Sequence, residues 1–458
     1  MIDRKSASIA ALLIFAATVI HLPTFAQPLV ERQAFRQTQT AFAASLFHER
    51  GIDLFHPLVP VLGPPWQMTF EFPLFQAVAA LVMELGVGPE VALRAVSFTS
   101  FLATGLLIWG FLRWTTGNAA AVAALTIFLF SPFGLLWGRT SMIEYGATAG
   151  AVGFAWGAVH WRERGGRRAF IVAIAAGSVA MLIKAPTAVF WVLPFAALGF
   201  RRDPQGPLHR HVRDPAAWAL VLVPVALGLA WTAYADAVKI ATPATAHLTS
   251  AALVTWNFGT PAQRLDPEVW ITVAKRVALA GGWLLPLSGL LLITARRERQ
   301  VLFWAWVVTA AVLPILTFSN LYYVHDYYFA AISPALAMLV GGGFGSLVRL
   351  WPRVALRATL AAVLLSTAAV LIARSYWLPM YAAVSDPEQI LPRAAQIRNQ
   401  TRPDDLVAIN ASAWNPALLY YADRWGTQVG DEVTRLPGFV VVHCTAWNEP
   451  DPRCVRLD

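Results

Sequence analysis

The sequence has few charged residues and almost no cysteine. Only 13% of its 458 residues are Asp, Glu, Lys or Arg, about half the fraction found in soluble domains, which excludes an ordinary soluble protein. It has no G-x-x-x-x-G-K-[ST] motif and no G-x-G-x-x-G motif after a strand-like run, so nothing predicts binding of ATP or a dinucleotide. The two cysteines, Cys444 and Cys454, exclude a disulfide-rich scaffold.

Long apolar runs are abundant instead. Hydrophobic residues make up 57% of the chain, and runs of about 20 apolar residues, the length of a membrane-crossing helix, recur along it. Because these runs are too long for barrel strands, we predict an all-α polytopic membrane protein. The eleven predicted spans are 6–26, 90–112, 118–138, 142–161, 168–184, 186–200, 215–236, 273–295, 300–318, 328–348 and 356–375.

The first apolar run is compatible with a cleaved signal peptide or with an uncleaved span, and the many later spans favour the uncleaved one. With the N-terminus in the cytoplasm, the basic clusters all fall on the cytoplasmic side, as the positive-inside rule requires. The net charge of +9 therefore reflects topology and does not indicate nucleic-acid binding. The clusters are Arg113, 161–168, 201–213, 295–300 and 349–357.

The same orientation places three loops and the C-terminal tail outside, in the periplasm of a bacterial inner membrane. The loops are about 27–89, 237–272 and 319–328. Residues 72–88 are apolar but too short for a span, and we predict a helix at the outer interface. A loop as long as the first one is usually functional.

The tail differs from the rest in composition, so we predict two domains, a membrane domain (1–375) and a small periplasmic α/β domain (376–458). The tail has strand-like runs at 404–410 and 438–444 and a helical pattern at 415–426 that Gly426 would end. Cys444 and Cys454 form either a disulfide or two free thiols, and an oxidising periplasm favours the disulfide.

Ionisable groups gather on the predicted outer side. Arg36 has the planar guanidinium that suits a phosphate. Glu71 lies between Phe70 and Phe72, so we expect burial to raise the pKa of its carboxyl, as suits a base or a metal ligand. Other members of this group lie at the outer ends of predicted spans: Arg139, Glu144, Lys184, His325, Tyr327 and Tyr328.

Ionisable groups at membrane depth are costly and are usually functional or paired. Their convergence on one side predicts a site at the outer leaflet. Ordinary alternatives remain for several of them: Arg139 with Glu144 as a plain salt bridge, Lys184 reaching towards the interface, and Glu31 with Arg32 as an exposed pair.

Five segments resemble bacterial polyprenyl-phosphate-dependent glycosyltransferases of the GT-C class, which include relatives of the protein O-mannosyltransferases and lipid A aminoarabinose transferases. The resemblance covers about residues 6–375. Some relatives have an aspartate inside the first segment. This sequence has Gln39 at that position. The segments are FRQTQTA (35–41), PVLGPPWQMTFEFPLFQ (60–76), WGRTSMIEYGATAG (137–150), KAPTA (184–188) and HDYYFAAISPALA (325–337).

The resemblance implies transfer of a sugar from a polyprenyl-phosphate donor to a periplasmic acceptor by an inverting single displacement. A divalent metal is compatible with this reaction but not required. The alternatives are a catalytically silent scaffold, an O-antigen-type ligase or polymerase, and a transporter. The implied residues are Glu31 and Glu71 for catalysis, Arg36, Lys184, His325 and Arg139 for the donor phosphate, and Gln37, Gln39, Glu144 and Tyr328 for substrate binding.

Overall fold

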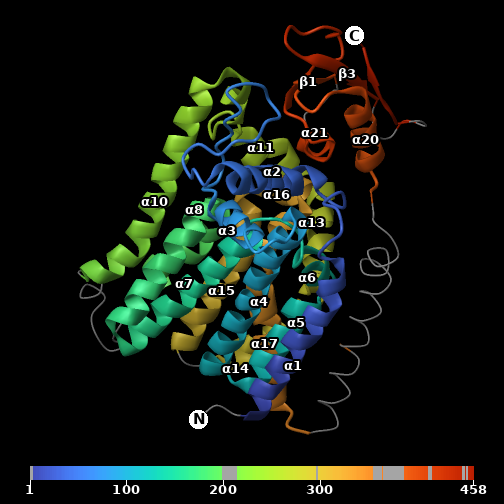
Figure 1. The fold of residues 1–458 in the computed structure, drawn as a ribbon. Helices are drawn as coiled ribbons and strands as arrows, with labels where there is room; N and C mark the ends of the chain where they lie inside the picture. The colour runs from blue at the N-terminus through green and yellow to red at the C-terminus, as the bar shows by residue number, and fades with distance from the viewer. Residues whose placement is uncertain are drawn as a thin grey trace.

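The computed structural model describes residues 4–198, 214–295, 298–353, 364, 386–410, 415–445, 449 and 452–457. They form a bundle of long helices with a small sheet set on one end (Figure 1). We call the end under the sheet the capped end, and the opposite end, where the N-terminus lies, the open end. The long helices are α1 (Arg4–His21), α4 (Pro89–Thr115), α5 (Asn118–Phe130), α7 (Glu144–Arg164), α8 (Arg167–Leu198), α10 (Pro215–Ala241), α13 (Pro267–Leu279), α15 (Glu298–Thr317) and α17 (Ser333–Leu350).

Six of the described helices are long and apolar enough to cross a membrane when α8 is counted as one helix, or seven if one bent pair also counts as a span. The prediction of eleven spans is not settled by this count, and the last of them, 356–375, lies outside the described residues except for Leu364. The shorter helices are η1 (Leu22–Thr24), α6 (Pro132–Trp137), η2 (Pro243–Leu248), α11 (Val254–Phe258), α12 (Pro261–Leu265), η3 (Gly282–Gly289), α14 (Leu290–Thr294), α16 (Ser319–Val324) and η4 (Asp326–Ala331).

The predicted span at 273–295 is not one straight helix. The chain bends by 83° between α13 and the η3–α14 segment. Gly281 lies at the break with a φ of 94°, a backbone conformation that favours glycine over residues with a side chain.

Helix α8 consists of two helical segments that meet at Lys184, whose φ of −159° and ψ of 88° are not helical. Pro186 cannot donate to the carbonyl of Leu182, and that carbonyl instead accepts from the backbone N–H of Phe72 at 3.1 Å. Gly177 in the first segment and Phe195 in the second both pack on Phe154 of α7. In a continuous helix they would lie about 27 Å apart, so the chain folds back at Lys184, where the sequence predicts the boundary between two spans.

The first loop contains two helices that cover the capped end. Helix α2 (Ala34–Arg50) includes the whole FRQTQTA segment, which the sequence analysis did not predict to be helical. Helix α3 (Leu74–Met83) has 10 residues and is thus about 15 Å long, too short to cross a bilayer. This length agrees with the prediction that 72–88 is not a span. The exposed apolar side chains on α3 include Val78 and Leu81.

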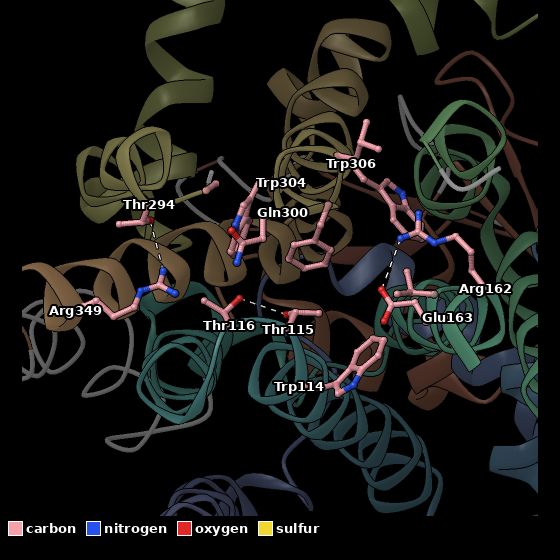
Figure 2. Close-up of a pocket in the computed structure, with 14 residues that line it drawn as sticks. Trp114, Thr115, Thr116, Arg162, Glu163, Thr294, Gln300, Trp304, Trp306 and Arg349 are labelled. Carbon is pink, nitrogen blue, oxygen red and sulfur yellow. Dashed lines mark hydrogen bonds and ion pairs between the residues drawn. The ribbon is translucent and has the colours of Figure 1, made fainter. Parts of the chain in front are cut away.

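At the open end, the ends of α4, α7, α15 and α17 surround a pocket of about 270 Å³ (Figure 2). Several arginines lie near this end, including Arg113 in the last turn of α4 and Arg349 in the last turn of α17.

The C-terminal region contains α20 (Ile390–Gln400), α21 (Pro416–Ala422) and a four-stranded sheet in the order β2-β1-β3-β4. Strand β1 pairs in parallel with both β2 and β3, and β3 pairs antiparallel with β4. Both predicted strands are present, but the predicted helix 415–426 is too long: Asp423 leaves the helix with a φ of 56°, and Gly426 begins β2. The strands are β1 (Val407–Asn410), β2 (Gly426–Val429), β3 (Val440–Cys444) and β4 (Cys454–Arg456).

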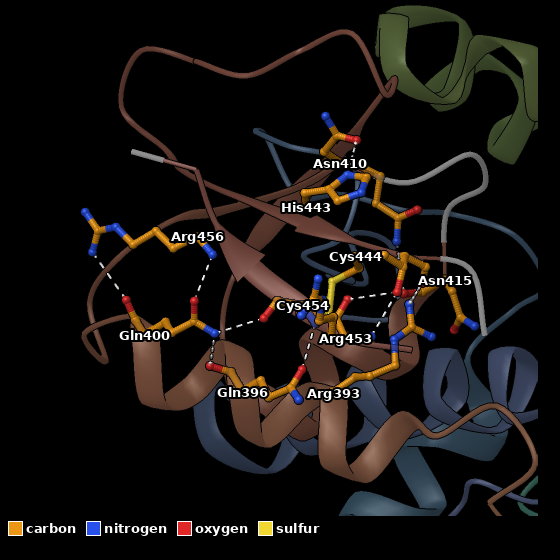
Figure 3. The surroundings of a disulfide bond; sticks show 12 residues. Arg393, Gln396, Gln400, Asn410, Asn415, His443, Cys444, Arg453, Cys454 and Arg456 are labelled. Carbon is orange, nitrogen blue, oxygen red and sulfur yellow. Dashed lines mark hydrogen bonds between the residues drawn. A yellow bond between two sulfur atoms is a disulfide. The ribbon is translucent and has the colours of Figure 1, made fainter. Parts of the chain in front are cut away.

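The structure contains the disulfide between Cys444 and Cys454 (Figure 3). The two residues are opposite each other in the antiparallel register of β3 and β4. The bond therefore joins the last strand of the sheet to its neighbour.

The C-terminal region and the first loop share one hydrophobic core, so their boundary in sequence is not a boundary in packing. Val59 and Met68 of the loop pack with Ile409 and Leu419 of the tail in the same cluster. Gly426 also exchanges backbone hydrogen bonds with the loop, donating to the carbonyl of Pro60 at 3.0 Å and accepting from Gly63 at 3.1 Å. The sheet therefore holds the first loop in place over the bundle.

Candidate active site

Glu31 holds the beginning of the first loop against the bundle. Its two carboxylate oxygens accept from Arg94 at 3.1 Å and from Arg139 at 2.6 Å. Arg94 also donates to the carbonyls of Phe25 at 2.9 Å and Pro28 at 3.2 Å. Burial raises the pKa of Glu31, but the charges of the two arginines outweigh it and leave the pKa below its ordinary value. The carboxylate is thus ionised and held by two cations.

This arrangement differs from the exposed Glu31–Arg32 pair considered from the sequence. Glu31 is buried, and Arg32 pairs with Asp326 at 3.0 Å instead. Arg94 was not predicted as part of any site. A cation inside the apolar run 90–112 is the signal that would have found it, since such a charge is costly unless it is paired.

Gln37 lies in the same buried layer. Its amide oxygen accepts from the backbone N–H of Ser141 at 2.9 Å, and its amide nitrogen donates to the carbonyl of Arg32 at 3.0 Å. Both ends of the side chain are therefore used within the protein, and the side chain is fully buried. The structure thus ties Gln37 to the packing of α2 and does not expose it to a substrate.

A second cluster, the Arg36–Glu71 pair with Gln39, is mostly buried, with Arg36 20% and Glu71 25% exposed. Arg36 donates to Glu71 at 2.8 Å and to the amide oxygen of Gln39 at 2.8 Å. Burial raises the pKa of Glu71, but the positive charges of Arg36 and Lys184 lower it by more. The pKa of Glu71 is therefore below its ordinary value. The expectation that apolar neighbours raise this pKa is therefore wrong, because it left out the cations that the fold brings to the carboxylate.

Lys184, at the fold-back of α8, pairs with Glu144 at the start of α7. Its ammonium also lies over the ring of Tyr328 at 4.3 Å and that of Tyr327 at 5.2 Å. The partners thus differ from the predicted Arg139–Glu144 salt bridge: Glu144 pairs with Lys184, and Arg139 with Glu31. The second oxygen of Glu144 is buried and accepts no hydrogen bond within the described residues.

His325 lies beside the same tyrosines, with ring centroids 5.1 Å from Tyr327 and 6.0 Å from Tyr328. Burial lowers its pKa to about 4, with help from the charges on Arg36, Lys184 and Arg276. The imidazole is therefore neutral near pH 7. It can offer one N–H to a ligand, but it does not supply the positive charge that a phosphate-binding role would use.

A cavity of only about 20 Å³ adjoins Arg36 and Glu71. Roughly one water molecule occupies a space of this size, so the cavity as it stands is too small for a sugar. Neither Glu31 nor Arg139 lines the cavity. The lining residues are Arg36, Gln39, Thr40, Ala43, Pro57, Val59, Met68, Phe70, Glu71, Pro73, Gln76 and Ile143.

Across the part of the chain that the structure describes, no three His, Cys, Asp or Glu side chains come close enough to hold a metal ion. The carboxylates of the site are also each paired with a cation of the protein. The described residues therefore do not fit a bound metal.

No protein-family model matches this sequence, and no curated protein is similar to it by sequence comparison. Solved structures share its fold. ArnT from Cupriavidus metallidurans bound to undecaprenyl phosphate is 16% identical with a TM-score of 0.62, over 92% of this chain and 86% of that chain. The oligosaccharyltransferase AglB from Archaeoglobus fulgidus, in complex with an inhibitory peptide and a dolichol-phosphate, is 13% identical with a TM-score of 0.57, over 93% of this chain and 65% of that chain.

A third similar structure is the Archaeoglobus fulgidus oligosaccharyltransferase in complex with Zn and sulfate, 11% identical with a TM-score of 0.53, over 93% of this chain and 62% of that chain. ArnT and AglB are of the GT-C class. The likeness covers almost the whole of this chain, so its fold is the GT-C fold that the sequence motifs indicated.

Proposed function

We propose that this protein is a membrane glycosyltransferase that moves a sugar from a polyprenyl-phosphate donor to an acceptor at the capped end. The observation that carries the proposal is the convergence of two cations, Arg36 and Lys184, with two carboxylates, Glu71 and Glu144, beneath the first loop. The fold supports it, since a structure with the same fold carries undecaprenyl phosphate.

In the membrane, the capped end would face the periplasm. Basic residues at the open end support this orientation, including Arg4 at the start of α1, Arg162 and Arg164 at the end of α7, and Arg349 at the end of α17. The positive-inside rule places such residues on the cytoplasmic side. The disulfide agrees with an oxidising compartment for the capped end.

In the proposed reaction, the acceptor oxygen or nitrogen forms a bond to C1 of the sugar while the bond from C1 to the phosphate oxygen breaks. The acceptor loses a proton, and the leaving polyprenyl phosphate gains negative charge. Arg36 and Lys184 are the cations placed to stabilise that charge. A single displacement of this kind inverts the anomeric centre.

We assign the proton acceptor to Glu71. Its side chain lines the cavity and is 25% exposed, whereas that of Glu31 is 8% exposed and has both oxygens engaged. Because the pKa of Glu71 is lowered, its carboxylate is a weak base. It therefore acts late, taking the proton as the new bond makes the acceptor acidic.

The experiment is transfer in proteoliposomes from a panel of radiolabelled undecaprenyl-phosphate sugars, with wild type beside Glu71→Gln. Glu84→Gln is the matched control, since Glu84 lies just after α3, outside the cavity lining, with its side chain 61% exposed. We expect the wild type and Glu84→Gln to use one donor, and Glu71→Gln to lose at least about 100-fold in rate, the lower range for removal of a general base.

Full activity of Glu71→Gln would refute the assignment of the base. Failure of every donor with folded wild-type protein would favour a catalytically silent scaffold instead, with Gln39 at the position of the relatives' aspartate as its first explanation. Release of polymer or of a ligated glycan instead of single sugars would indicate a ligase or polymerase.

A further inference from the structure

The open-end pocket lies between the ends of long helices (Figure 2), and those helix ends lie at the end of the bundle opposite the sheet (Figure 1). Its volume of about 270 Å³ is close to the lower end of the range for sites that hold small organic ligands, about 300 Å³. The cavity beside Arg36 and Glu71 has only about 20 Å³. The proposed reaction gives the larger pocket no role.

The polar lining lies on two sides of the pocket, with one arginine on each side. Arg349 donates to the hydroxyls of Ser346 at 3.1 Å and Thr294 at 3.4 Å. Arg162 lies on the other side of the pocket, with a guanidinium nitrogen 3.7 Å from a carboxylate oxygen of Glu163. Among the described residues, the lining thus carries two cations and one anion. Thr115, Thr116 and Gln300 add neutral hydrogen-bonding groups between the two arginines.

The rest of the wall is aromatic, formed by Trp114, Phe303, Trp304 and Trp306. Tryptophan at the ends of membrane helices marks the level of the lipid headgroups. Next to the pocket, the exposed apolar side chains on α14 and α15 include Leu292, which is 89% exposed, Ile293 and Val301. A charged pocket that opens beside an exposed apolar surface fits an amphipathic molecule.

The partial charge of helix ends explains the position of the two arginines. Arg162 and Arg349 lie in the last turns of α7 and α17, where cations offset the partial negative charge of the helix carbonyls. That explains two basic residues at helix ends. It does not explain a pocket of this size between them, or its aromatic wall.

We propose that the open-end pocket binds the phosphate headgroup of an anionic membrane lipid. Arg349 donates to the phosphate oxygens, with hydroxyl and amide groups of Thr115, Thr116 and Gln300 beside it, while Arg162 pairs with Glu163 on the opposite side of the pocket. The acyl or polyprenyl chain lies along the apolar surface of α14 and α15. Basic pockets between membrane helices on the cytoplasmic side are a recurring form of lipid recognition.

The test is native mass spectrometry of the delipidated full-length protein in detergent, titrated separately with phosphatidylglycerol, undecaprenyl phosphate, neutral diacylglycerol and inorganic phosphate. The variant is Arg349→Gln, whose exposed side chain makes unfolding no concern. The control is Arg353→Gln, an exposed arginine four residues further on that does not line the pocket.

We expect one of the two phosphate-bearing lipids to bind, and Arg349→Gln to weaken that binding about tenfold, the effect of losing one charge-assisted hydrogen bond. Arg353→Gln should change it less than twofold. The lipid whose binding Arg349→Gln weakens identifies the source of the phosphate. Binding at the candidate active site does not affect this comparison, because Arg349 is not part of that site. An equal effect of both variants, no effect of either, equal binding of diacylglycerol, or equally tight binding of inorganic phosphate would each overturn the proposal.

Discussion

Replacement of Glu31 by glutamine separates a structural role from a catalytic one. The change keeps the shape of the side chain but removes its charge, so Arg94 and Arg139 lose their shared anion. The side chains of these arginines are 0% and 1% exposed, and neither can move into water without disturbing the helix ends around it. We expect Glu31→Gln to destabilise the fold strongly.

The magnitude follows from the geometry. Each carboxylate oxygen lies within 3.1 Å of a guanidinium nitrogen. For charge centres about 4 Å apart at an effective dielectric constant near 20, each pair contributes about 4 kcal/mol, or roughly 8 kcal/mol for the two. Part of this is returned because a neutral glutamine costs less to bury than a carboxylate. A net loss of about 3–5 kcal/mol agrees with the measured cost of breaking buried pairs by removing one partner.

The assay is the unfolding free energy of the purified protein in detergent, measured together with transfer activity at a temperature where both proteins are folded. Glu71→Gln is the matched comparison, because its carboxylate is 25% exposed and its loss leaves Arg36 partly in water. We expect Glu71→Gln to destabilise the protein less than Glu31→Gln does, because the Arg36–Glu71 pair is more exposed than the pairs of Glu31, while it abolishes transfer.

The reverse pattern would refute this reasoning. If Glu31→Gln keeps the stability of the wild type and abolishes transfer, Glu31 is the catalytic carboxylate that the family resemblance implied. The ion pairs with Arg94 and Arg139 would then position a base rather than hold a loop.

Three further changes test other parts of the structure. Lys184→Gln should abolish transfer and also destabilise the protein by about 3–5 kcal/mol, because it leaves the buried Glu144 without its cation; unfolding and transfer assays measure both effects. For His325, whose pKa is lowered from 6.5 to about 4, the unfolded chain takes up a proton as pH falls below about 6.5 while the folded protein does not. Stability should therefore fall between pH 7 and pH 4, and His325→Gln should reduce that fall in unfolding measurements; an unchanged slope would contradict a buried neutral imidazole. Replacing Cys444 and Cys454 by serine opens a loop with a sequence separation of 10 and should cost about 2–3 kcal/mol, seen as earlier proteolysis of the C-terminal region, whereas equal protection of both proteins would contradict it.

The sequence predicted those features that depend on local pattern. Apolar runs predicted most of the long helices, and strand-like runs in the tail predicted both β1 and β3. The reversal at Lys184 was also predictable, because charge alternation required a boundary there. The bend at Gly281 was not, since a glycine pair in an apolar run is compatible with a straight helix until its φ is known.

The sequence indicated which residues belong to the candidate site, but not which ion pairs they form with one another. The sequence indicated that Glu31, Glu71, Arg139, Glu144 and Lys184 belong to one side of the molecule, and they do lie near one end of the bundle. Which cation meets which carboxylate depends on the relative height and rotation of helices that are distant in sequence. The lowered pKa of Glu71 shows the consequence, because a prediction from its sequence neighbours had the wrong sign.

Helix α2 connects the C-terminal region to the proposed chemistry. Its residues Arg36 and Gln39 line the cavity, while Ala34 and Phe42 belong to the core that the loop shares with the tail. The tail reinforces this contact, since the ring of Tyr420 packs on that of Phe42 at 5.3 Å. A cavity of about 20 Å³ is too small for a sugar, so we expect the loop to move if the proposed donor sugar binds here. Because the sheet is bonded to that loop through Gly426, the loop cannot open without moving the sheet or breaking those bonds. The C-terminal region and the first loop therefore form one packed unit over the candidate site.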